Sequence, residues 1–111
     1  MRSKNGWKRV ECPPDRWVRV VTIENDTGET QMVQLAIDAP RGTELRWRTR
    51  RPWWWRFERT VIERTIPLSG PQVIGFGNKL PRWSLHLRID ERAQIDVMIS
   101  TRPDLRLTFP S

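Results

Sequence analysis

Apolar and polar residues alternate along most of this chain, and the alternation predicts β-strands. It is clearest in two neighbouring runs, residues 83–89 and residues 93–100, in which every second residue is apolar. A period of two places the apolar side chains on one face of a strand and the polar ones on the other. We therefore expect these runs to form a β-hairpin that closes at Glu91 and Arg92, with His86 on its polar face.

Weaker patterns of the same kind extend over the rest of the chain. Residues 16–24 and 30–38 are rich in β-branched and apolar residues and flank the turn-forming sequence NDTGE, which predicts a second hairpin. Residues 45–50 and 54–66 predict a third hairpin, whose second strand needs a bulge or an edge position because Arg59 and Ile62 break its alternation. Shorter strands are expected at residues 72–77 and 105–109, with a turn at 39–43 and a loop at 67–72.

The spacing of these patterns predicts the fold class. No stretch has apolar residues at helical spacing, and turn-forming residues recur about every ten residues, which is typical of all-β domains. We predict about eight strands in a single-domain antiparallel β-sandwich, immunoglobulin-like or jelly-roll, with a small β-barrel as the alternative. The domain is expected to span residues 16–111. Residues 1–15 are basic and contain two prolines, so we expect them to form an N-terminal arm.

Composition restricts the chemistry of the chain. Its 111 residues are 37% hydrophobic, enough for one modest core. Cys12 is the only cysteine, so no intramolecular disulfide can form, and together with the single His86 it gives too few ligands for a usual zinc site. No paired nucleophile and base and no phosphate-binding glycine loop occurs. We therefore expect a protein that is not an enzyme, with no catalytic residues, no metal and no cofactor.

The sequence also suggests where the protein is found. The first residues lack the apolar run of a signal peptide, and no later run is long enough to cross a bilayer. We expect a soluble intracellular protein, cytoplasmic at synthesis, which in the finished state can belong to a virion or another large particle.

Positive charge and tryptophan are concentrated in residues 41–64. The chain has 20 Lys and Arg residues against 13 Asp and Glu, and this stretch alone holds eight Arg against three Glu and four of the seven Trp. Three tryptophans, Trp53, Trp54 and Trp55, are consecutive. In an extended chain they cannot all face one core, because neighbouring side chains point to opposite sides. At least one indole is therefore expected to be exposed or covered by a partner.

The combination of Arg and Trp predicts an interaction surface, because these residue types are enriched at interface hot spots. We predict a non-enzymatic interaction and assembly protein, consistent with a viral or phage structural or accessory subunit. Its partner would be another protein or further copies of itself, which makes a homo-oligomer the expected state. The expected partner-binding residues are Arg50, Arg51, Trp53, Trp54, Trp55 and Arg56.

Two other partners fit the same residues. The first is single-stranded nucleic acid, RNA in particular: indoles of the protein would stack on its bases while Arg46, Arg48 and Arg50 bind its phosphates. Residues 51–56, RPWWWR, resemble the Trp/Arg core of short cationic antimicrobial peptides of the tritrpticin and indolicidin kind, which implies shallow binding to anionic membranes. We rank membrane binding lowest. The ordinary explanation also stays open, in which most of the indoles are core residues and the Arg excess reflects genome composition.

Overall fold

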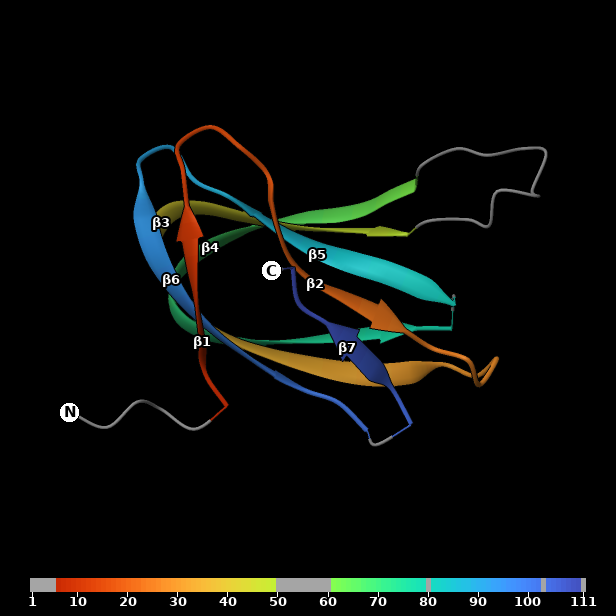
Figure 1. Cartoon of the computed structure of the whole chain (residues 1–111). Helices are drawn as coiled ribbons and strands as arrows, with labels where there is room; N and C mark the ends of the chain where they lie inside the picture. The colour runs from red at the N-terminus through yellow and green to blue at the C-terminus, as the bar shows by residue number, and fades with distance from the viewer. Residues whose placement is uncertain (1–5, 50–60, 80, 103, 111) are drawn as a thin grey trace.

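The computed structural model of the chain describes residues 6–49, 61–79, 81–102 and 104–110 (Figure 1). These residues form seven strands in one antiparallel sheet and contain no helix, which confirms the expected all-β class. The third hairpin is confirmed as far as its residues are described, because residues 45–49 pair with residues 61–66. The strands are β1 (Lys8–Cys12), β2 (Val18–Glu24), β3 (Gln31–Thr49), β4 (Val61–Asn78), β5 (Arg82–Arg88), β6 (Ala93–Ser100) and β7 (Arg106–Thr108).

The long strand β3 is the centre of the sheet, and it is bent at its middle. Residues 34–38 of β3 pair with β6, whereas residues 44–49 pair with β5 on the same side of the strand. β4 runs along the other side of β3 over both halves. The bend lies at residues 40–42, where β3 has two residues more than β4 and Gly42 has a φ of 95°. Glycine suits this left-handed conformation because it has no Cβ to clash.

The bend makes two of the predicted hairpins wrong. β5 and β6 do not pair with each other. Both run antiparallel to β3, and the bend at Asp90 and Glu91 carries the chain onward in the same direction instead of reversing it. β2 pairs with β5 and β7 and not with β3. The reason is that β4 occupies one side of β3 while β5 and β6 together occupy the other.

Two segments that we expected to be a turn and a loop lie inside strands. Residues 39–43 form the bulged bend of β3, and residues 67–72 belong to β4. β4 tolerates Pro67 and Pro71 because it pairs only with β3 among the described strands, and an edge strand does not need every N–H for its ladder. β4 also has the expected irregularity, since its register shifts at Glu63.

The N-terminal segment contributes to the sheet. Lys8–Cys12, in the part of the chain that we expected to be an arm, forms β1, which pairs with β6 and buries Val10 and Cys12. The described residues therefore form seven strands where we expected about eight, because two pairs of predicted runs join into β3 and β4 while β1 is added.

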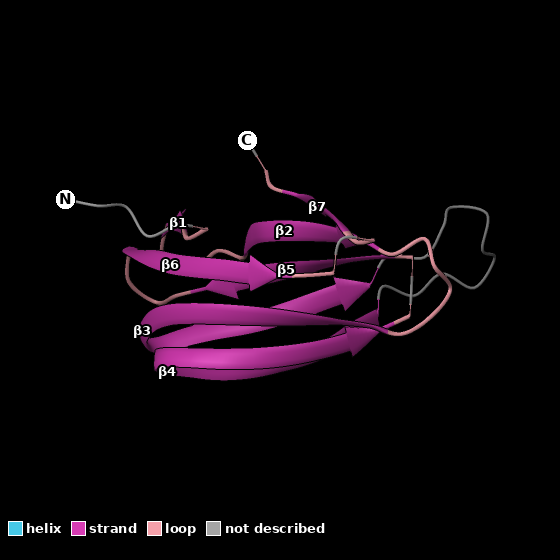
Figure 2. Ribbon diagram, turned by 90° about the horizontal axis from the view of Figure 1, so that it is seen from below, coloured by secondary structure: helices cyan, strands magenta, loops and turns pink. Residues whose placement is uncertain are grey.

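The two halves of the bent sheet enclose one core, so that the sheet is curled into a half-barrel (Figure 2). Phe76, in the part of β4 beside the first half of β3, contacts aromatic rings from the other half. Its ring centroid lies 4.5 Å from that of Trp47 and 5.9 Å from that of Trp83. Trp83 is only 2% exposed. These aromatic contacts hold the two halves of the sheet together.

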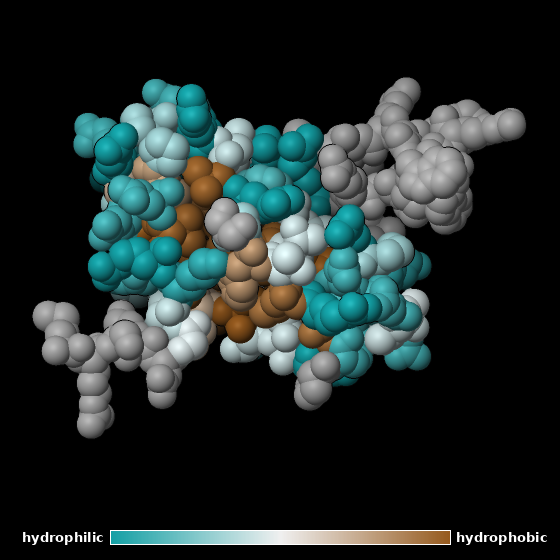
Figure 3. Space-filling model, in the orientation of Figure 1, coloured by the Kyte–Doolittle hydropathy of each residue, from teal (hydrophilic) through white to brown (hydrophobic). Residues whose placement is uncertain are grey.

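The open side of the half-barrel lies between β1 and the strands β2 and β7. The Nζ atom of Lys8 lies 4.0 Å from the ring centroid of Phe109, which follows β7, so a cation–π contact spans this side. Apolar surface is visible in the middle of the same face, between polar margins (Figure 3). The curled sheet is thus closed here by side chains and not by backbone pairing.

Candidate anion-binding face

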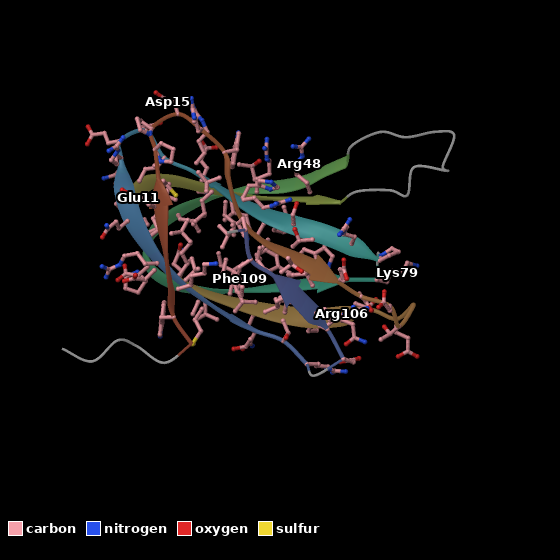
Figure 4. All side chains as sticks on the ribbon, viewed as in Figure 1. Glu11, Asp15, Arg48, Lys79, Arg106 and Phe109 are labelled. Carbon is pink, nitrogen blue, oxygen red and sulfur yellow. The ribbon has the colours of Figure 1, made fainter. Side chains whose placement is uncertain are left out.

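The outer face of the sheet carries a group of basic side chains from three neighbouring strands. Arg19 on β2 lies opposite His86 on β5, and His86 lies opposite Arg46 on β3, so these residues form one row across the sheet. Arg48 follows two positions along β3 on the same side, and its side chain projects from the sheet near the end of the strand (Figure 4). Directly opposed side chains in such a row have Cβ atoms about 5 Å apart.

Alternation along each strand explains why these residues face outwards. Their neighbours Leu45, Leu85 and Leu87 are fully buried in the core. With a period of two, the intervening residues must lie on the other face. We call the group Trp17, Arg19, Arg46, Arg48 and His86 the basic face.

Trp17 joins the basic face just before β2 begins. The guanidinium carbon of Arg46 lies 3.9 Å from the centroid of the Trp17 ring, which is a close cation–π contact. Both side chains are half-buried. The contact fixes Arg46 on the surface of the sheet, so that less side-chain entropy is lost when Arg46 binds an anion.

The arginines of the basic face lack acidic partners within the described part of the chain. Arg19, Arg46 and Arg48 form no ion pair there, although Arg88, two positions from His86, pairs with both Asp15 and Glu44. The other ion pairs among the described residues lie elsewhere on the surface, between Arg9 and Asp96, Arg82 and Glu24, and Arg106 and Asp26. No described carboxylate therefore lies within ion-pair distance of Arg19, Arg46 or Arg48.

The pKa of His86 responds to both burial and the neighbouring arginines. Burial, and then the charges of Arg46, Arg48 and Arg19, together lower this pKa to about 4. His86 is therefore neutral at pH 7. Burial, and then Arg48, also lower the pKa of Arg46. Two buried nitrogen atoms of the face, Nδ1 of His86 and Nε of Arg46, have no hydrogen-bond partner among the described residues.

The basic face borders an open groove of about 570 Å³ between β1 and the start of β2. Val10, Val18 and Val20 supply apolar lining, while Lys8, Arg9, Arg19 and His86 add basic or polar groups. Among the described residues that line it, Glu11 is the only acidic one. The groove therefore extends the positive surface towards β1.

The structure describes only part of the site that the sequence predicts. Arg46 and Arg48 lie on one face, as strand alternation requires, whereas Arg50, Arg51, Arg56 and the three consecutive tryptophans, Trp53 to Trp55, lie outside the described residues. Their role in partner binding stays a prediction. Trp47 packs in the core against Phe76, as the ordinary explanation of the tryptophan cluster expects.

Sequence reasoning missed Trp17 and Arg19 as members of the site, and it treated His86 as an isolated surface histidine. Their sequence positions give no signal, because the three residues meet only through the pairing of β2 with β5 and of β5 with β3. That pairing differs from the hairpins that the sequence predicts.

Similarity to known proteins gives no indication of the function, so the function is argued from the residues of the chain. Comparisons with protein-family models, with curated proteins and with solved structures found no match. Within the described ranges, no three His, Cys, Asp or Glu side chains are grouped so that they could hold a metal ion. The same residues include no helix with the length and apolar character needed to cross a membrane.

Proposed function

We propose that this protein is a non-enzymatic interaction protein that docks the basic face onto an acidic surface of a protein partner. The observation that carries the proposal is the convergence of Arg19, Arg46 and Arg48 around neutral His86, with no described carboxylate in an ion pair with any of them. Guanidinium groups bind carboxylates through two parallel N–H···O bonds, so a clustered acidic surface is a chemically matched partner.

Burial of the described indoles favours a protein partner over nucleic acid. Trp7, Trp17 and Trp47 are half-buried and Trp83 is buried, so none of these rings is an exposed platform for a base. One face of the Trp17 ring is already covered by Arg46. Binding of single-stranded nucleic acid depends strongly on stacked aromatic rings, and the described residues supply charge without such a platform.

Single-stranded nucleic acid is the second candidate partner, because the same arginines suit phosphates. A role as a subunit of a virion or another large particle, and an intracellular location, form part of the proposal. Cys12 supports the intracellular location, since it is an unpaired and fully buried thiol, which a reducing compartment maintains.

Two triple variants with the same change in net charge test the proposal. One replaces the arginines of the basic face with Gln, and the control replaces three exposed arginines that lie elsewhere. The replaced residues are Arg19, Arg46 and Arg48 in the first variant and Arg41, Arg92 and Arg102 in the control. Binding to fluorescein-labelled polyglutamate and to fluorescein-labelled oligouridine is measured by anisotropy at low and physiological salt.

We expect the first variant to bind polyglutamate about tenfold or more weakly than the wild type, while the control changes little. Equal losses in both variants would show that only net charge matters and would refute a specific face. Tighter binding of oligouridine than of polyglutamate at physiological salt would favour the nucleic-acid candidate instead.

A further inference from the structure

Most of β4, from Thr65 to Asn78, combines an unpaired backbone edge with a complete lack of charge. Residues 65–78, TIPLSGPQVIGFGN, contain no charged residue, although 30% of the chain is charged. β4 pairs only with β3 among the described strands, and Figure 2 shows it at the margin of the molecule. Sheet proteins usually protect such an edge with charges, prolines or bulges, because unpaired N–H and C=O groups can bind another strand.

Pairing with β3 shows which backbone groups of β4 point away from the sheet. Pro71 has no N–H and lies opposite Asp38, whose other neighbour is Asp96 on β6. The backbone groups of Pro71 therefore face the free edge, since a proline is tolerated where no ladder bond is needed. Alternation in an antiparallel pair gives the same orientation to Val73, Gly75 and Gly77.

The edge is protected in one part and open in the next. Pro67 and Pro71 remove donors from the region before Gln72, but residues 73–77 contain no proline, no charge and no bulge. Val73 is 70% exposed, and a side chain added at Gly75 would meet no atom within 4 Å. The open part of the edge is therefore both unprotected and accessible to a second strand.

We propose that two copies of this chain join edge to edge through residues 73–77 of β4, in an antiparallel pair about a two-fold axis at Gly75. In this register Gly75 faces the partner's Gly75, and Val73 faces the partner's Gly77. Each of these pairs exchanges two N–H···O bonds. A shift by two residues towards the start of β4 brings in Pro71, which has no N–H to donate, so the register centred on Gly75 is favoured.

The exposed apolar side chains explain why the partner is a second copy. The Sδ atom of Met32 lies 3.0 Å from the position of a Cβ on Gly77, and Met32 is 52% exposed. In the proposed register the partner's Val73 lies directly opposite Gly77 on this same face, so it covers Met32. The two-fold axis repeats the contact, and the exposed Val73 and Met32 of both copies are buried together.

Charge points to the same arrangement. Two copies with a formal net charge of +7 repel each other, and the uncharged edge lets them approach without opposing like charges. An isologous pair uses the free edge of β4 in both copies, so no β4 edge is left for a third copy and the assembly is a dimer. The basic face lies on β2, β5 and the second half of β3, so both copies retain it. The dimer is therefore independent of the proposed anionic partner.

Sedimentation equilibrium over micromolar to millimolar concentrations tests the proposal with three variants. Gly75→Pro removes the central outward N–H without removing a bond to β3, whereas the matched control Gly75→Ala retains that N–H. Val73→Lys places a like charge at each end of the pair. We expect the wild type and Gly75→Ala to be dimers, and we expect Gly75→Pro and Val73→Lys to be monomers.

Thermal unfolding followed by circular dichroism separates loss of pairing from loss of folding. Val73 is largely exposed, so Val73→Lys should fold even if Gly75→Pro does not. In that case the oligomeric state of Val73→Lys decides whether the proposed dimer exists. A monomeric wild type, a dimer that persists in folded Gly75→Pro or in Val73→Lys, or a species larger than a dimer would overturn the proposal.

Discussion

The titration of His86 gives a direct test of the electrostatics of the basic face. His86 is the only histidine of the chain, so a proton NMR titration shows one imidazole signal with no overlap. We expect the folded protein to titrate at a pKa of about 4 instead of the ordinary 6.5. The change Arg46→Gln removes one of the charges that lower the pKa, so it should move the midpoint upwards, although burial still keeps it below 6.5.

The same pKa shift links stability to pH. Between pH 6.5 and about 4 the unfolded chain binds a proton at His86 that the folded chain does not, so stability falls as pH is lowered. The contribution of His86 is complete above pH 6.5 and is lost as pH approaches 4. For a fully buried group, a shift of about 2.5 pH units corresponds to about 3.4 kcal/mol. His86 is half-buried, and screening by solvent reduces the effect to about 1–2 kcal/mol.

Urea unfolding of the wild type and of His86→Gln, at pH 7 and near pH 4, measures this contribution. Carboxylates titrate in the same range, but they do so in both proteins and cancel in the comparison. We expect the wild type to lose about 1–2 kcal/mol more than His86→Gln on acidification. Equal losses, or an NMR midpoint near the ordinary value, would refute the view that the arginines and burial keep His86 neutral.

Three further predictions follow from the core and the backbone. Trp83→Ala should lower the free energy of unfolding by about 3–5 kcal/mol in urea titrations, because it leaves a cavity beside Phe76. Cys12 is fully buried and burial raises the pKa of its thiol, so a thiol reagent should modify it only after denaturant is added; rapid modification of the native protein would contradict this. Gly42→Ala forces a φ of 95° on a residue with a Cβ, and we expect a loss of about 1 kcal/mol or more in thermal unfolding, whereas the matched change Gly75→Ala should cost less.

Alternation predicts the individual strands well because it depends only on which side chains are buried. The runs around Trp83 and Ile95 are strands with the expected inner faces, and His86 lies on the outer face as expected. Alternation does not predict which strands pair with each other. The bend at Asp90 and Glu91 resembles a hairpin turn in composition, and only the bent course of β3 shows that the chain continues in the same direction there.

Proline and glycine misled the sequence reasoning in β4. Pro67, Gly70 and Pro71 are typical of a loop, but an edge strand accepts proline wherever the N–H points outwards. The basic face was only partly predictable for a related reason. Arg46 and Arg48 follow from local alternation, whereas the contribution of Trp17 and Arg19 depends on the order of strands in the sheet.

The pairing of β1 with β6 has a consequence for how the chain folds. Arg9 and Asp96, which form an ion pair across these strands, are 87 positions apart in the sequence. β1 therefore acquires its partner only after β2 to β5 and then β6 have been synthesised. Because such distant pairings dominate this sheet, folding is expected on the slow scale of milliseconds to seconds that is typical of all-β proteins. Until then Val10 and Cys12 stay exposed, and the interval before β6 emerges is when this chain is most vulnerable to aggregation.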